Sequence, residues 1–195
     1  MWTNDQRTRA TKRTIRRAFT GLLRRKPIQS ISVKELCASA GVSRGTFYAH
    51  YTGLYDLLGQ LEEELMEAVR RGLSRLLEGP PEARSLLEVT AELFRTLGAN
   101  ADLCAMVLGP NGDKEFARRL VRLGREYFTE AYRLSFPQAT PKQLGYYYAF
   151  VSSGCVGLLE TWLGEGMATS AEEMAALAEG IMRDGMGFFQ NRGER

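Results

Sequence analysis

The chain has 195 residues, of which 44% are hydrophobic, and contains three widely spaced cysteines. This composition is sufficient for one large or two small domains with a buried core. An odd number of cysteines offers no disulfide framework, and the polar opening Met1–Asp5 has no apolar run typical of a signal peptide. We therefore expect a protein of the reducing cytoplasm.

The net charge of +3 conceals an uneven distribution of charge. Residues 1–57 hold 11 Lys and Arg against 3 Asp and Glu, a balance of +8, whereas the remainder holds 15 against 20, a balance of −5. A basic head on an acidic body is typical of a protein that binds a polyanion with one part only. Arginines on a solvated helix face would give the same charge count. The sequence motif within residues 1–57 therefore has to decide whether this part binds a polyanion.

The first predicted helix runs from about Arg7 to Arg25. Ile15, Phe19 and Leu22 repeat at intervals of three and four on one face, the basic residues occupy the other, and Pro27 ends the helix.

Two short helices joined by a tight turn follow over residues 32–51. Ser32 is a predicted cap, and Glu35 three residues later completes a capping box. Gly41 is placed to end the helix in the left-handed conformation that glycine adopts at little cost. Ser43 then caps a second helix that carries Arg44, Thr46, Tyr48 and His50 around a buried Phe47. This is the pattern of a DNA-reading helix-turn-helix.

The remaining pattern predicts helices over about 53–77, 82–97, 101–108, 113–134 and 141–165, and a last helix after a capping box at Ser170 that reaches Phe189. The stretch Gln143–Leu159 has no charged residue, but its tyrosines, serines and glycines favour a helix buried on nearly all sides over a membrane span. No strand is predicted. We expect an all-α fold of about nine helices, with a three-helix helix-turn-helix DNA-binding domain over 1–57 and a helical bundle for ligand binding and dimerisation over 58–195.

The segment from about Thr11 to Leu58 resembles the DNA-binding domain of the TetR/AcrR family of bacterial transcriptional regulators. The match rests on the run Ile31–Tyr51 and on Tyr55–Leu58. Four stretches resemble more closely the DhaS-type branch of that family, namely His50–Leu58, Leu108–Asp113, Trp162–Met167 and Ser170–Met174. The resemblance implies double-stranded DNA as a partner, with the protein on the nucleoid when bound.

The predicted DNA-binding residues are Lys34, Ser43, Arg44, Gly45, Thr46, Tyr48, Ala49, His50 and Tyr55. The resemblance implies that Thr46, Tyr48 and His50 mostly contact the DNA backbone, and that Lys34, Gly45 and Ala49 lie near bases. Most family members also carry a lysine shortly after the aromatic residues of the reading helix. This chain has Thr52, Gly53 and Leu54 there, so the arginines of the first helix have to compensate or DNA affinity is modest.

The residue inventory argues against catalysis. The only histidine, His50, lies in the predicted reading helix, so a nucleophile–base pair with any cysteine and a histidine-based metal site are both excluded. No glycine-rich loop follows a strand. We expect no enzyme activity, no metal and no cofactor.

The body is expected to hold a small apolar or amphipathic effector of unknown identity, in a pocket enclosed by the fourth to eighth helices. The residues predicted to line it are Phe94, Met106, Tyr127, Tyr147, Phe150 and Trp162. The residues predicted to form a two-fold dimer interface are Ser153, Gly154, Gly157, Ile181, Met182, Met186 and Phe188. Our hypothesis is a homodimeric repressor that leaves a near-palindromic operator when its effector binds. The alternative is a co-regulator whose body docks a protein partner, and an enzyme on a helical scaffold is disfavoured.

Overall fold

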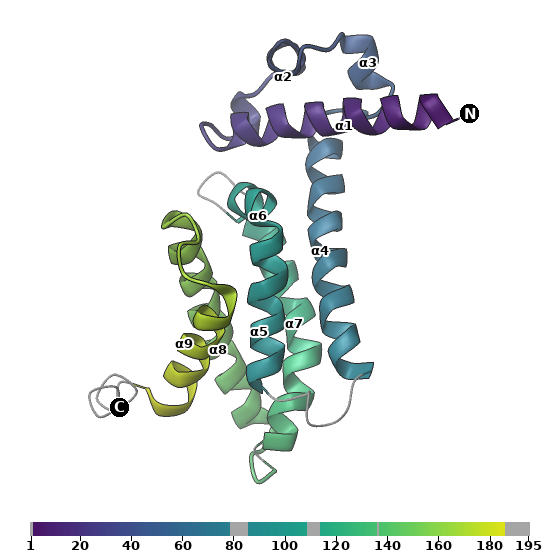
Figure 1. The fold of residues 1–195 in the computed structure, drawn as a ribbon. Helices are drawn as coiled ribbons and strands as arrows, with labels where there is room; N and C mark the ends of the chain where they lie inside the picture. The colour runs from purple at the N-terminus through teal and green to yellow at the C-terminus, as the bar shows by residue number, and fades with distance from the viewer. Residues whose placement is uncertain (1, 79–85, 109–113, 136, 186–195) are drawn as a thin grey trace. The chain divides into compact units, whose positions relative to one another are not determined.

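The computed structural model describes residues 2–78, 86–108, 114–135 and 137–185. Over these residues the chain forms nine α-helices and one short 3-10 helix, and no strand (Figure 1). The helices are α1 (Trp2–Leu23), η1 (Ile28–Ser30), α2 (Val33–Ala40), α3 (Arg44–Tyr48), α4 (Leu54–Glu78), α5 (Leu86–Ala99), α6 (Ala101–Val107), α7 (Lys114–Ser135), α8 (Pro141–Gly164) and α9 (Ala171–Asp184). The predicted all-α fold is therefore confirmed.

The chain divides into two compact units, Met1–Leu65 with Asp102–Lys114, and Met66–Ala101 with Glu115–Arg195. Helix α4 begins in the first unit and ends in the second, and α6 belongs almost wholly to the first. The division into independent domains at residues 57 and 58 stays a prediction.

The core of the first unit is formed by apolar side chains from α1, α2, α3 and α4. Ile15, Phe19, Leu36, Phe47 and Leu57 are all fully buried. In Figure 1, α2 and α3 lie on one side of α1. The core thus fixes α3 against the other helices of the first unit through its buried Phe47.

The buried side of α4 begins at Leu57. Leu57 is fully buried, while Leu54 and Leu58 are only partly so. Leu57, Leu61 and Leu65 follow one another at intervals of four, which places them on a single line of the helix. That line faces the core of the first unit.

The second unit packs α5, α7, α8, α9 and the second part of α4 (Figure 1). The indole of Trp162 meets Phe94 edge to face, with ring centroids 5.6 Å apart, and its Nε1 donates to the carbonyl of Thr169 at 2.8 Å. A Cβ atom at Gly98 would lie 3.1 Å from the Trp162 ring, so a larger residue there would require this ring to shift by a few tenths of an ångström.

Capping residues set the starts of α8 and α9 as the sequence predicts. Thr140 and Gln143 exchange hydrogen bonds in a capping box before α8, and Ser170 and Glu173 do the same before α9. The predicted end of the last helix, near Phe189, falls outside the described residues, which end at Gly185.

Helix α8 differs from the prediction that it is buried on nearly all sides. It buries Tyr148, Val151, Leu159 and Trp162, but Tyr146 is 70% and Phe150 76% exposed. Within the described residues its opposite face is therefore exposed, because the described helices of the unit cover only one side. No helix of the described part of the chain is long and apolar enough to cross a membrane.

Candidate functional site

The start of α2 is fixed by its cap and by an ion pair. The Ser32 hydroxyl accepts from the Glu35 amide at 3.2 Å, as predicted, while the Glu35 carboxylate accepts from Lys26 Nζ at 2.7 Å. This hydrogen bond to Lys26 is the main reason why the pKa of Glu35 lies below its ordinary value. Lys34 is exposed on the same first turn, so its ammonium group is available to an anion.

The turn between α2 and α3 has the predicted left-handed glycine. Gly41 has φ 64° and ψ 31°, and the Val42 amide donates to the Cys37 carbonyl at 3.0 Å. A residue with a Cβ would be strained at this φ. Ser43 follows in an extended conformation and accepts from the Thr46 amide at 3.0 Å, which confirms its predicted role as the cap of α3.

Helix α3 presents a continuous exposed surface around its buried Phe47. Arg44, Gly45 and Ala49 are exposed, and Tyr48 is 56% exposed although its ring contacts that of Phe47 edge to face at 5.3 Å. The short side chains of Gly45 and Ala49 leave room for a close approach by another molecule. Among the described residues of the first unit, no other element therefore covers this face of α3.

The last predicted DNA contacts lie just beyond α3. The helix ends at Tyr48, so His50 stands in the turn after it and not on the helix as we expected. This happens because the amides of His50 and Tyr51 both donate to the Phe47 carbonyl and tighten the chain into a turn. Tyr55, on the first turn of α4, is 64% exposed. The nine residues thus come from α2, the turn before α3, α3 itself, the turn after it and α4, and their contact with DNA stays a prediction.

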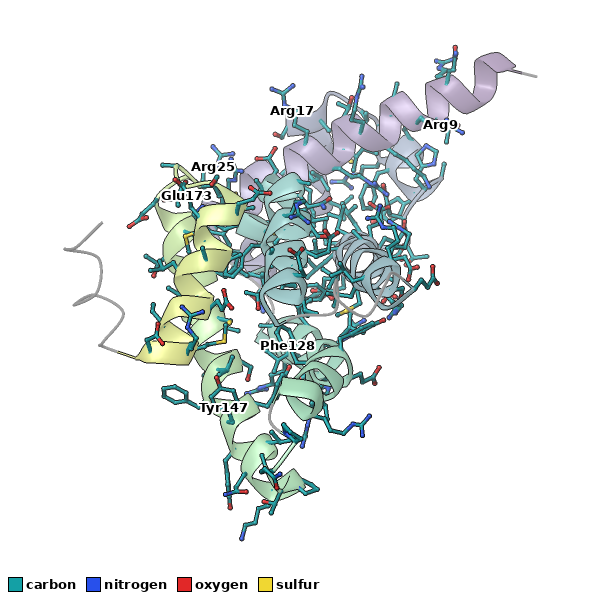
Figure 2. The ribbon with its side chains drawn as sticks, turned by 60° about the horizontal axis from the view of Figure 1, so that its bottom comes forward. Arg9, Arg17, Arg25, Phe128, Tyr147 and Glu173 are labelled. Carbon is teal, nitrogen blue, oxygen red and sulfur yellow. The ribbon has the colours of Figure 1, made fainter. Side chains whose placement is uncertain are left out.

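Basic side chains are arrayed along α1 and in the turn after it, and Figure 2 labels Arg9 and Arg17 on α1 and Arg25 in that turn. All three are exposed. Arg16 has a different role, since its guanidinium donates to both carboxylate oxygens of Glu64 at 2.8 and 2.6 Å and to the Tyr51 hydroxyl at 3.4 Å. Arg16 thereby joins α1 to α4 within the first unit, while the other arginines remain on the surface.

The start of α4 shows what replaces the lysine that most family members carry there. The Thr52 amide donates to the Asp56 carboxylate at 2.7 Å, and this hydrogen bond is the main cause that lowers the pKa of Asp56. The Asp56 carboxylate thus binds the backbone of residues 52–56, and this segment contains no basic residue. The hydroxyls of Thr52 and Tyr55 are the side-chain groups of this segment that can donate to a phosphate, while positive charge comes from α1 and Arg44.

The second unit contains an apolar cavity of about 60 Å³ between α4, α5, α7 and α8. It is lined by Val69, Leu93, Phe94, Leu97, Leu120, Val121, Gly124, Phe128, Tyr148, Val151, Ser152, Cys155, Val156 and Leu159. The Tyr148 hydroxyl donates to the Val121 carbonyl across the α7–α8 wall, and burial raises the pKa of Tyr148 to about 12. The wall therefore carries no charge at neutral pH, and Figure 2 marks Phe128 on its α7 side.

Only one of the six predicted ligand residues, Phe94, lines this cavity. Trp162 packs behind Phe94, and the Tyr127 hydroxyl lies 3.3 Å from that of Ser74. Tyr147 points to α9, where its hydroxyl donates to the Met182 carbonyl at 3.2 Å. Phe150 is exposed on α8, and the side chain of Met106 lies outside the described part of the structure.

The sequence analysis missed the aliphatic lining because such residues look like ordinary core. One sequence pattern could have indicated the cavity. Tyr148, Ser152, Cys155 and Leu159 follow one another on α8 at intervals of three and four, so this inward face has two small side chains between two large ones. Together with Gly124 on α7, the small residues leave the space that the cavity occupies.

Three of the seven predicted dimer residues lie on the exposed side of α8, and two lie on α9. Ser153, Gly154 and Gly157 are exposed, and with Tyr146 and Phe150 they form what we term the α8 outer face. Ile181 and Met182 on α9 are partly buried. Met186 and Phe188 lie outside the described residues.

The cysteines are poorly suited to redox sensing. Burial raises the pKa of Cys104 to about 12 and that of Cys155 to about 11, and it also raises the pKa of Cys37. The reactive thiolate is therefore scarce at neutral pH. Within the described residues, no three His, Cys, Asp or Glu side chains gather as metal ligands would.

We expect slow alkylation of all three thiols in the native protein. At pH 8, iodoacetamide should label native Cys37, Cys104 and Cys155 at least tenfold more slowly than the same residues in denaturant, because an unperturbed thiol has a pKa of about 8.5. Mass spectrometry of timed samples measures this. Rapid native labelling of Cys155, which is only partly buried, would contradict its raised pKa.

Comparison with known families decides the class of the protein. Residues 11–61 match the family described as bacterial regulatory proteins, tetR family, and residues 84–184 match the transcriptional regulator C-terminal region of such proteins. The chain belongs to the TetR family of transcriptional regulators. Members of this family are DNA-binding regulators, so the protein is a regulator and not an enzyme. The closer assignment to a DhaS-like branch stays a prediction.

Solved structures share the fold of this TetR-family chain. The fatty acid degradation regulator FadR from Bacillus halodurans has a TM-score of 0.67 at 14% identity, covering 88% of this chain and 94% of its own. A TetR transcriptional regulator from Streptococcus agalactiae has a TM-score of 0.58 at 22% identity, covering 93% and 98%. The dihydroxyacetone kinase operon activator DhaS has a TM-score of 0.55 at 16% identity, covering 88% and 93%. A comparison with curated proteins gives no match.

Proposed function

We propose that this TetR-family regulator is a homodimeric cytoplasmic repressor, and that a small apolar or amphipathic effector lowers its affinity for a near-palindromic operator. The observation that carries the proposal is the apolar cavity. One of its walls is Val69 on α4, the helix whose first part, through Leu57, Leu61 and Leu65, belongs to the core of the DNA-binding unit.

The size of the cavity supports a coupled mechanism. At about 60 Å³ it is well below the roughly 300–1,000 Å³ of typical ligand sites. An effector therefore has to displace the walls, and so it binds an expanded state better than the state described here. A ligand shifts an equilibrium only through such a difference in affinity. If the expanded state moves α4, the ligand changes the placement of the DNA-binding units.

A second contact bears on the same coupling. Arg24 at the end of α1 and Asp102 in α6 form an ion pair of 2.5 Å within the first unit. Both side chains are at least half exposed, so the pair contributes on the order of 0–1 kcal/mol to stability. An ion pair this weak influences the placement of α6 against α1 but does not hold it fixed. We propose that α4 carries the main coupling.

Dimerisation is supported by the α8 outer face. A surface with two largely exposed aromatic side chains beside exposed Ser153, Gly154 and Gly157 permits a second helix to approach closely. An isologous interface formed by the same face of two chains would cover it. The co-regulator alternative uses the same observation, with a different protein on this face.

The proposal is tested by screening hydrophobic compounds for a thermal shift and for a change in Trp162 fluorescence, and by repeating an operator-binding assay with each hit. Trp162 is a suitable reporter because it packs on Phe94, a wall of the cavity. We expect hits to weaken operator binding by roughly 5–150-fold, a coupling of about 1–3 kcal/mol. Hits that bind tightly yet leave operator affinity unchanged would favour the co-regulator alternative.

A further inference from the structure

A polar groove lies on α7 and α8, next to the apolar cavity. It measures about 510 Å³ and is lined by Ala117, Arg118, Val121, Arg122, Ser152, Ser153 and Val156. Val121, Ser152 and Val156 also line the apolar cavity. The polar groove and the apolar cavity therefore share a wall, and a displacement of these three side chains would join them.

The charge in the polar groove is positive. Glu115 accepts from Arg122 at 2.7 Å and from Arg118 at 3.3 Å, so one carboxylate is shared by two guanidinium groups. The hydrogen bond from Arg122, and then that from Arg118, lowers the pKa of Glu115, which keeps this carboxylate ionised. Together, Glu115, Arg118 and Arg122 carry a net charge of +1. Each guanidinium has five N–H donors, so several remain for a further acceptor.

A hydroxyl group stands at the junction with the apolar cavity. Ser152 lines both spaces and donates to the Ala149 carbonyl at 3.3 Å, and its oxygen can also accept or turn toward a new partner. Behind Ser152 the lining of the cavity is almost wholly aliphatic and aromatic. The site thus has a cationic, hydrogen-bonding entrance and a narrow apolar interior.

We propose that the effector is a slim amphipathic acid, whose unbranched apolar chain enters the apolar cavity while its anionic head binds Arg118 and Arg122 in the polar groove. This inference rests on the proposed effector function and names the chemistry of that effector. A neutral head would gain little from two guanidinium groups, and a cationic head would be repelled by the net positive charge. An unbranched chain displaces the least wall in so small a cavity.

Isothermal titration of the full-length protein tests the inference with four ten-carbon probes below their critical micelle concentrations. These are decanoate, decyl phosphate, decanol and decylamine. We expect decanoate or decyl phosphate to bind most tightly and decylamine least. The two acids distinguish a carboxylate from a phosphate head. Within the carboxylates, affinity should rise about three- to fourfold per added methylene until the chain fills the space.

The decisive variant is Arg118→Gln with Arg122→Gln. It should weaken binding of the preferred acid by about tenfold or more, as expected for loss of charge-assisted contacts at a partly exposed site, and leave decanol unchanged. The matched control is Arg70→Gln with Arg71→Gln on α4, where two arginines share Glu67 in the same way. The control should leave binding of every probe unchanged, and thermal melts should show both double variants folded.

Equal binding of decanol and decanoate, or an acid affinity that survives Arg118→Gln with Arg122→Gln, would overturn the inference. The operator assay separates this failure from that of the proposed function. If the acid binds through the two arginines but operator affinity is unchanged, the inference stands and the proposed release of the operator by an effector is wrong. If decanol weakens operator binding as well as the acids do, the proposed release of the operator stands and the preference for an anionic head is wrong.

Discussion

Replacing Phe150 by Glu should convert the protein to a monomer and thereby remove high-affinity operator binding. Phe150 is the most exposed large apolar side chain of the described residues, at 76%, and lies at the centre of the α8 outer face. In an isologous dimer the substitution places two unpaired carboxylates in one interface. A buried charge without a partner costs about 3–5 kcal/mol, so dimer affinity should fall by more than about 100-fold. Light scattering coupled to gel filtration measures the change.

The matched control for Phe150→Glu is Thr129→Glu, which adds the same charge to an exposed position of α7. It should remain a dimer with unchanged operator affinity. A Phe150→Glu protein that is still dimeric would show that the chains associate elsewhere. In that case the α8 outer face becomes the best surface for the protein partner of the co-regulator alternative.

Replacing Tyr48 by Ala should weaken binding to every duplex sequence, operator or not. Tyr48 is exposed on α3 beside residues with short side chains, and we predict that its hydroxyl contacts a phosphate. Loss of a hydrogen bond to a charged group costs about 1.5–3 kcal/mol, a weakening of roughly 10–150-fold. Fluorescence anisotropy with operator and with random DNA measures both affinities.

The variant Tyr48→Phe separates the hydroxyl from the ring. It keeps the edge-to-face contact with Phe47, so the fold of α3 should be undisturbed. If the hydroxyl carries the contact, Tyr48→Phe should lose nearly as much affinity as Tyr48→Ala. A Tyr48→Phe protein with full affinity would instead assign Tyr48 a packing role. His50→Ala should behave as Tyr48→Ala does, with a smaller loss because His50 is half-buried.

The local structure of the DNA-binding unit could be predicted because its signals are short-range. Gly41 adopts the left-handed turn, and Ser43 caps α3 through an amide three residues away. Each depends only on neighbours in sequence. The position of His50 beyond the end of α3 could not be predicted, because the end of a five-residue helix is set by competing turns whose energies differ little.

The cavity could not be predicted in the same way. Its walls are ordinary core residues of four helices, and whether they leave space depends on how Ser152 and Cys155 on α8 align with Gly124 on α7. Helix α8 is apolar on most sides, so its periodicity gives no clear inward direction. That is why Phe150 was placed in the pocket when it lies on the α8 outer face.

Selection of binding sites from random duplex DNA with the full-length protein tests the central claim most directly. Two copies of the α2–α3 surface related by a two-fold axis should enrich a near-palindrome. Its half-sites should be centred about one turn of DNA apart, roughly 34–36 Å, or somewhat more. Binding should weaken steeply as salt rises. Enrichment of a single isolated half-site would contradict the dimer, and failure to bind duplex DNA at low salt would contradict the account of the DNA-binding surface.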